Sequence, residues 1–126
     1  MNIAVSWHTP SIVLLQFRPG WSWDDLYTAI KEADALIASA DHVVHLVIDL
    51  SRAGRIPGDF LRVAGDVFAS GAARSNEGQR LVVGAGALIR AGYNTLAHVY
   101  GGSLRARPFR FVNSLAEAYA LLESAG

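Results

Sequence analysis

Two kinds of hydrophobic pattern alternate along this chain of 126 residues. Compact apolar stretches rich in valine, isoleucine, leucine and aromatic residues predict β-strands. There are five of them, at Asn2–Trp7, Ser11–Arg18, His42–Leu50, Leu81–Val83 and Phe109–Val112. Apolar residues spaced by three or four positions predict α-helices. These segments are Trp23–Ala40, Asp59–Ala73, Ala87–Tyr100 and a last one that begins after Ser114.

Residues typical of helix starts support the first and last of these helices. Ser22 stands where an N-cap is expected, and Asp24 and Asp25 follow it in the first turn, where the helix dipole favours acidic residues. Ser114 and Glu117 have the Ser-x-x-Glu spacing of a capping box. Both helices therefore have a defined beginning.

The stretch from Val43 to Ile48 is nearly continuous apolar sequence, which suits the centre of a parallel sheet. Strand–helix–strand connections are right-handed almost without exception, so the last four strands should form a largely parallel sheet. The first strand joins it antiparallel through a short turn at His8–Pro10. We therefore predict an α/β fold, one domain over residues 1–126. It has a single-layer, mixed, mostly parallel five-stranded sheet and four helices, in the order β-β-α-β-α-β-α-β-α.

Composition narrows the class of protein. Hydrophobic residues make up 52% of the chain and charged residues 17%, which excludes a disordered protein. The longest nearly apolar run, Leu81–Ile89, is too short to span a membrane, and no secretory signal is visible, so we expect a cytoplasmic protein. There is no cysteine for a disulfide or a thiolate metal site.

The net charge is zero, which argues against a nucleic-acid-binding protein, but the charges are unevenly placed. Residues 1–73 hold five basic and eight acidic side chains, a balance of −3, and residues 74–126 hold six and three, a balance of +3. Between Gly78 and Ala116 five arginines meet no acidic residue. This pattern fits either a solvated surface or a surface for an anionic partner or a second copy of the chain.

Three segments carry a resemblance to a known family. They are Leu46–Ser51, which reads Leu-Val-Ile-Asp-Leu-Ser, the Trp21-Ser22-Trp23 helix start, and the closing Phe111–Ala118. With these the chain resembles the STAS / SpoIIAA-like superfamily, relatives of the bacterial anti-sigma-factor antagonists, from about Ser11 to Ala125. The resemblance implies the fold above and a regulatory, protein-binding function.

The chain departs from that family just after Ser51. Antagonists of the partner-switching type carry Asp-Ser-Ser-Gly at the next helix start, with one serine phosphorylated, whereas the aligned stretch here is Pro57–Phe60. Asp59 stands where the phosphorylated serine would be. Its carboxylate could imitate a permanent charge, or it could simply favour a helix N-terminus. Regulation by phosphorylation is not expected at this point.

Other motifs carry little chemistry. Gly84-x-Gly86 has Ile89 in place of the third glycine of a dinucleotide site, so tight packing of strand to helix is the better interpretation of these glycines. Asp49 lacks the acidic pair and the late lysine of a phosphoacceptor site, which leaves a structural role in bonding loop amides. The histidines have no metal-ligand spacing, and no serine sits in a nucleophile elbow. We therefore expect no enzyme activity, no cofactor and no metal.

Ligands of open α/β sheets bind outside the carboxyl ends of the parallel strands. The residues expected there are Arg18, Trp21, Asp49, Ser51, Arg52, Arg55 and Asp59. Trp21 is either a partly exposed binding residue or a side chain packed onto its own helix.

Two functions follow as hypotheses. The first is a non-catalytic regulatory or protein-binding module of the SpoIIAA-like type, which we also expect to form a homodimer. The alternative is a domain that binds a small apolar or lipid-like molecule near Trp21 and Trp23.

Overall fold

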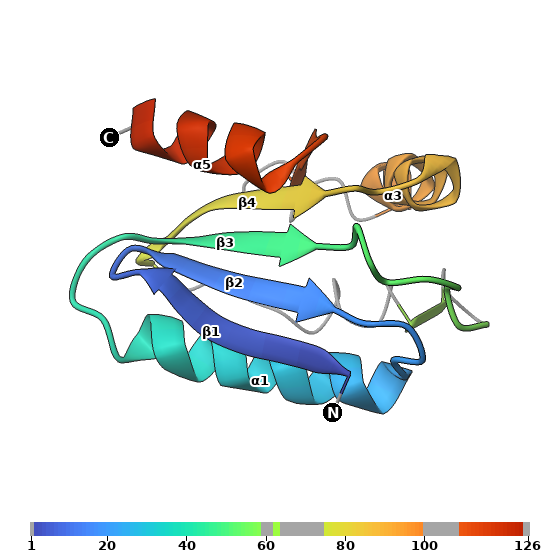
Figure 1. The fold of residues 1–126 in the computed structure, drawn as a ribbon, viewed down its shortest axis with the longest axis horizontal. Helices are drawn as coiled ribbons and strands as arrows, with labels where there is room; N and C mark the ends of the chain where they lie inside the picture. The colour runs from blue at the N-terminus through green and yellow to red at the C-terminus, as the bar shows by residue number, and fades with distance from the viewer. Residues whose placement is uncertain (1, 59–61, 64–74, 100–108, 125–126) are drawn as a thin grey trace.

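The computed structural model describes residues 2–58, 62–63, 75–99 and 109–124 of the chain (Figure 1). The strands are β1 (Ile3–Thr9), β2 (Ile12–Phe17), β3 (Val44–Asp49), β4 (Glu77–Val83) and β5 (Phe109–Val112). The helices are α1 (Trp23–Ala38), α3 (Ala87–Val99) and α5 (Leu115–Ser124).

The five strands form one sheet in the order β1-β2-β3-β4-β5. β1 pairs antiparallel with β2, and every other neighbouring pair is parallel. The predicted α/β fold with a mostly parallel five-stranded sheet is therefore confirmed. The helix predicted over residues 59–73 lies outside the described residues except for Arg62 and Val63, which are helical. Three of the four predicted helices are thus described.

Helices cover both faces of the sheet. In Figure 1, α1 lies along β1 and β2 on one side, and α5 lies on the opposite side of the fold. Each face of the sheet has its own hydrophobic core cluster, and alternate residues of β2 pack into one or the other. Val13 and Leu15 belong to the cluster beneath α1, and Leu14 belongs to the cluster beneath α5. Val47 in β3 is fully buried. The continuous apolar run of β3 therefore has the central position predicted for it.

α1 begins as the sequence predicts. The Ser22 hydroxyl oxygen accepts a hydrogen bond from the Asp25 amide at 3.2 Å, and the Asp25 carboxylate accepts one from the Ser22 amide at 3.1 Å. At the other end the Asn76 side-chain amide donates to the carbonyls of Ile37, Ala40 and His42. The capping box and this asparagine satisfy backbone groups that a helix leaves unpaired.

β4 begins at Glu77, four residues before the predicted Leu81. The first half of β4 is polar, so the search for apolar stretches placed the start of the strand too late. Glu77 is buried, and its carboxylate accepts two hydrogen bonds from the Arg80 guanidinium, at 2.6 and 3.1 Å. The guanidinium also lies 5.2 Å from the centre of the Phe109 ring. A buried charge is tolerated here because it is paired.

A histidine fits closely between β3 and β4 near their amino ends. The His45 Nδ1 atom accepts a hydrogen bond from the Gln79 amide at 2.9 Å, so it carries no proton. A Cβ atom at Gly78 would collide with the imidazole. Burial lowers the pKa of His45 below its ordinary value.

This arrangement predicts that the folded state loses stability as the pH falls. The lowered pKa keeps His45 neutral to a lower pH in the fold than in the unfolded chain, which takes up a proton near the ordinary pKa of 6.5. We expect the free energy of unfolding to decrease as the pH is lowered from about 7 to about 5. Urea unfolding followed by circular dichroism at each pH measures it.

Protonation of His42 has the opposite effect on the pH dependence of stability, so it must be removed from the measurement. The Pro10 carbonyl, and then Asp41, raise the pKa of His42, so its contribution is present at low pH and disappears as the pH rises. The measurement is therefore made in a His42→Ala background. In that background His45→Gln should flatten the slope, and an unchanged slope would contradict the role of His45.

Candidate functional site

Two tryptophans anchor the loop of residues 51–58, which follows β3. The Trp21 indole Nε1 donates to the Ala53 carbonyl at 3.1 Å, and the Trp23 Nε1 donates to the Gly58 carbonyl at 2.6 Å. Trp21 is only 6% exposed and packs edge-on against Phe17 and Trp23, with ring centres 4.9 and 5.0 Å apart. The interpretation of Trp21 as an exposed binding residue is therefore wrong, because the loop covers it; the packed alternative is confirmed.

Asp49 ends β3 and holds the first turn of this loop. Its Oδ1 atom accepts hydrogen bonds from the Ser51 amide at 3.0 Å and from the Ser51 hydroxyl at 2.6 Å. The Leu50 amide donates to the Val83 carbonyl of the neighbouring strand at 2.8 Å. The predicted structural role of Asp49 is confirmed.

The two glycines after β4 have different roles. Gly84 has a φ of +72°, and a Cβ atom there would lie 2.8 Å from the Ser51 Cα, so the two strand ends pack closely because position 84 has no side chain. Gly86 has no neighbour within 4 Å of the same point, and its carbonyl accepts the first hydrogen bond of α3, from Arg90. The predicted packing of strand to helix is therefore wrong for both glycines, because Gly84 packs against the turn at Ser51 and Gly86 faces open space.

A hollow of about 360 Å³ lies at this end of the sheet, between the loops that follow β3 and β4 and the first turn of α3. It is lined by Leu50, Ser51, Ala53, Gly54, Ile56, Gly84, Gly86 and Ile89. The lining is aliphatic or backbone except for the Ser51 hydroxyl. We call it the carboxyl-end hollow.

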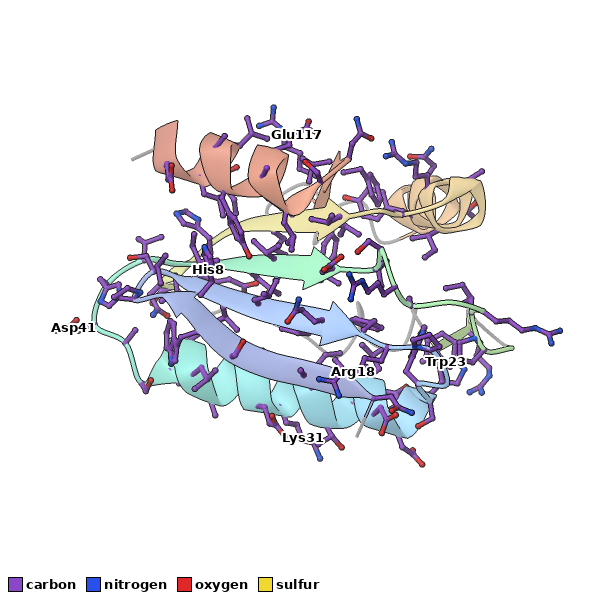
Figure 2. The ribbon with its side chains drawn as sticks, viewed as in Figure 1. His8, Arg18, Trp23, Lys31, Asp41 and Glu117 are labelled. Atoms are coloured by element: carbon purple, nitrogen blue, oxygen red, sulfur yellow. The ribbon has the colours of Figure 1, made fainter. Side chains whose placement is uncertain are left out.

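Positive charge flanks the carboxyl-end hollow. Arg52 and Arg55 are exposed and stand next to lining residues in the loop. Within the part of the chain that the structure describes, neither makes an ion pair or a side-chain hydrogen bond. Arg18 is exposed at the end of β2, and the next residue, Pro19, lies close to Gly54. Figure 2 shows Arg18 and Trp23 at this end of the sheet and Asp41 at the opposite end.

Of the predicted site residues, Ser51 lines the hollow, Arg52 and Arg55 belong to the same loop without lining it, and Arg18 lies on a neighbouring turn. Trp21 and Asp49 support the loop from beneath. Asp59 lies outside the described residues. Sequence reasoning missed the aliphatic walls Leu50, Ile56 and Ile89. The sequence held one indication of these walls, which is the apolar Ile56 in a loop rich in glycine and proline.

We compared the chain with models of known families, with curated proteins and with solved structures, and none of them matches it. Among the described residues no group of histidine, aspartate and glutamate side chains could hold a metal ion. In the same part of the chain no helix has the length and apolarity needed to cross a bilayer.

The packing at Gly84 predicts a large difference between two similar substitutions. Gly84→Ala forces a side chain into a left-handed backbone conformation and against Ser51, and should destabilise the fold by about 3 kcal/mol. Gly86→Ala meets no neighbour and should change stability by less than about 1 kcal/mol. Urea denaturation of both variants measures the difference, and equal stabilities would contradict the close approach.

The anchoring of the loop predicts that Trp21→Phe is destabilising. The change keeps an aromatic ring but removes the indole donor and leaves the carbonyl of the buried Ala53 unpaired, at a cost of about 1–3 kcal/mol. Trp7→Phe is the matched control, because Trp7 is 39% exposed, and should change stability by less than about 0.5 kcal/mol. Thermal unfolding compares the two variants. If Trp21→Phe is as stable as Trp7→Phe, the hydrogen bond from Trp21 does not stabilise the loop.

Proposed function

We propose that this chain is a non-catalytic regulatory or protein-binding module that contacts its partner with the carboxyl end of the sheet. The observation that carries the proposal is the carboxyl-end hollow beside two exposed arginines, Arg52 and Arg55. Apolar surface next to arginine is typical of the residues that contribute most to protein–protein binding. The resemblance of Leu46–Ser51 to SpoIIAA-like proteins supports the same function.

The chemistry at Ser51 favours binding over catalysis. Its hydroxyl donates to Asp49, whose same oxygen also accepts the Ser51 amide, an arrangement that shapes a turn. A nucleophilic serine is usually activated by a histidine within hydrogen-bond reach. His45 lies six residues back along the chain, about 20 Å away in extended conformation. The hydrogen bonds between Asp49 and Ser51 therefore stabilise the conformation of the loop.

The proposal includes a cytoplasmic protein that also associates with itself as a homodimer. It does not include a phosphorylation switch in the segment 57–60, because both serines of the family motif are replaced there. Partner binding would then be constitutive, or regulated elsewhere in the chain.

A second candidate, a binder of small apolar molecules, is favoured by the volume of the hollow. About 360 Å³ falls within the range of roughly 300–1,000 Å³ typical of ligand pockets, and the walls are aliphatic. The location differs from the one predicted near Trp21 and Trp23, since the indole N–H groups of both are bound to the loop.

Affinity capture from native lysate tests the protein-binding proposal. We expect the chain to retain a protein partner that the double variant Arg52→Glu, Arg55→Glu loses by at least tenfold, because both charges at the rim are reversed. Lys31→Glu is the matched control, since Lys31 is exposed on the outer side of α1 (Figure 2), and should retain the partner.

Two outcomes would contradict the proposal: equal capture by the double variant, or recovery of the chain alone. Native mass spectrometry of the same eluate distinguishes the second candidate function, small-molecule binding, from protein binding. A small molecule retained by the wild-type chain and absent from a Gly86→Leu variant would favour ligand binding instead.

A further inference from the structure

We propose that the carboxyl-end hollow accepts one large apolar side chain from an acidic peptide segment of the partner. The inference rests on the proposed protein-binding function and adds the chemistry of what is bound. The hollow selects the apolar side chain, and the arginines beside it select the acidic residues that flank that side chain.

The walls of the hollow define the apolar part. Leu50 and Ile56 come from the loop after β3, and Ile89 comes from the first turn of α3. Leu50 and Ile56 also pack against the buried core cluster, so the hollow is a continuation of the core that no described side chain fills. An apolar side chain placed there would leave water at about 25 cal/mol for each Å² buried.

The backbone around the hollow allows close approach. Gly86 has no side chain, and no heavy atom lies within 4 Å of the point where its Cβ atom would be. An extended peptide could lie against Gly86 while one of its side chains points inward. A polar or charged side chain would be disfavoured, because Ser51 offers the only side-chain hydrogen-bonding group among the described lining residues and its hydroxyl proton already binds Asp49.

Charge defines the rest of the segment. Arg52 and Arg55 flank the hollow in the loop, and within the described residues neither has an acidic partner in this chain. Of the two acidic residues nearest to these arginines along the chain, Asp49 accepts the amide and the hydroxyl of Ser51, and Asp59 lies outside the described residues. A segment that supplies Asp or Glu on either side of the apolar residue would pair with these arginines, whereas a basic segment would be repelled.

A library of short random peptides displayed on phage and selected against the full chain tests the inference. We expect the selected peptides to share one leucine, isoleucine, methionine or phenylalanine flanked by aspartate or glutamate. Selected peptides that are neutral or basic, or a selection that yields no binder, would overturn the inference.

Fluorescence polarisation with a selected peptide then locates its site. Gly86→Leu fills the hollow and should weaken binding at least tenfold. Thr28→Leu is the control, because Thr28 is exposed on α1 and does not line the hollow, and should bind as the wild type does. Binding should also weaken with added salt and in the Arg52→Glu, Arg55→Glu variant. The inference would be overturned by a peptide that binds Gly86→Leu as tightly as it binds the wild type, or by one whose affinity does not change with salt concentration.

The two proposals fail in different ways. If affinity capture depends on Arg52 and Arg55 but is unaffected by Gly86→Leu, the protein-binding function stands and the hollow is not where the partner inserts. If capture does not depend on the arginines, the protein-binding proposal itself fails. Circular dichroism and thermal unfolding of each variant establish that a loss of binding is not a loss of fold.

Discussion

Two hydrogen bonds from indole N–H groups to a loop hold the carboxyl end of this protein together. Trp21 and Trp23 stand at the start of α1, and their Nε1 atoms bind the carbonyls of Ala53 and Gly58. A loop with Gly54 and Gly58 has many accessible conformations, and an anchor at each of two carbonyls removes most of them. Because this loop supplies half the wall of the carboxyl-end hollow, the candidate site exists only while the tryptophans hold it.

The other wall depends on how closely two strand ends approach. Asp49 turns the chain at Ser51, and Gly84 lets the end of β4 lie against that turn without a side chain between them. Beyond this contact Gly86 precedes the first residue of α3 and leaves open space at the position of its missing side chain. The hollow is therefore a consequence of tight packing on one side and a missing side chain on the other.

Stability and the candidate site occupy opposite ends of the sheet. Near the amino end, the imidazole of His45 in β3 accepts a hydrogen bond from Gln79 of β4 and lies against Gly78, and the buried Glu77 pairs with Arg80 within β4. At the carboxyl end, exposed arginines and an unfilled apolar hollow remain without partners among the described residues. This division is common in α/β sheets, where a packed scaffold carries binding loops at the carboxyl ends of its strands.

The sequence by itself determined the kind of each element that the structure describes. Helical spacing, the Ser22 cap and the two-sided apolar run of β3 are local patterns, and local patterns are enough to assign elements. The tertiary structure alone decided that Trp21 is covered, that Gly84 is packed while Gly86 is open, and which aliphatic residues line the hollow. Those outcomes depend on contacts between segments far apart in the chain, such as Trp21 and Ala53, which are separated by 32 positions. No periodicity within one segment encodes such a contact, since it is set by how the elements pack against one another.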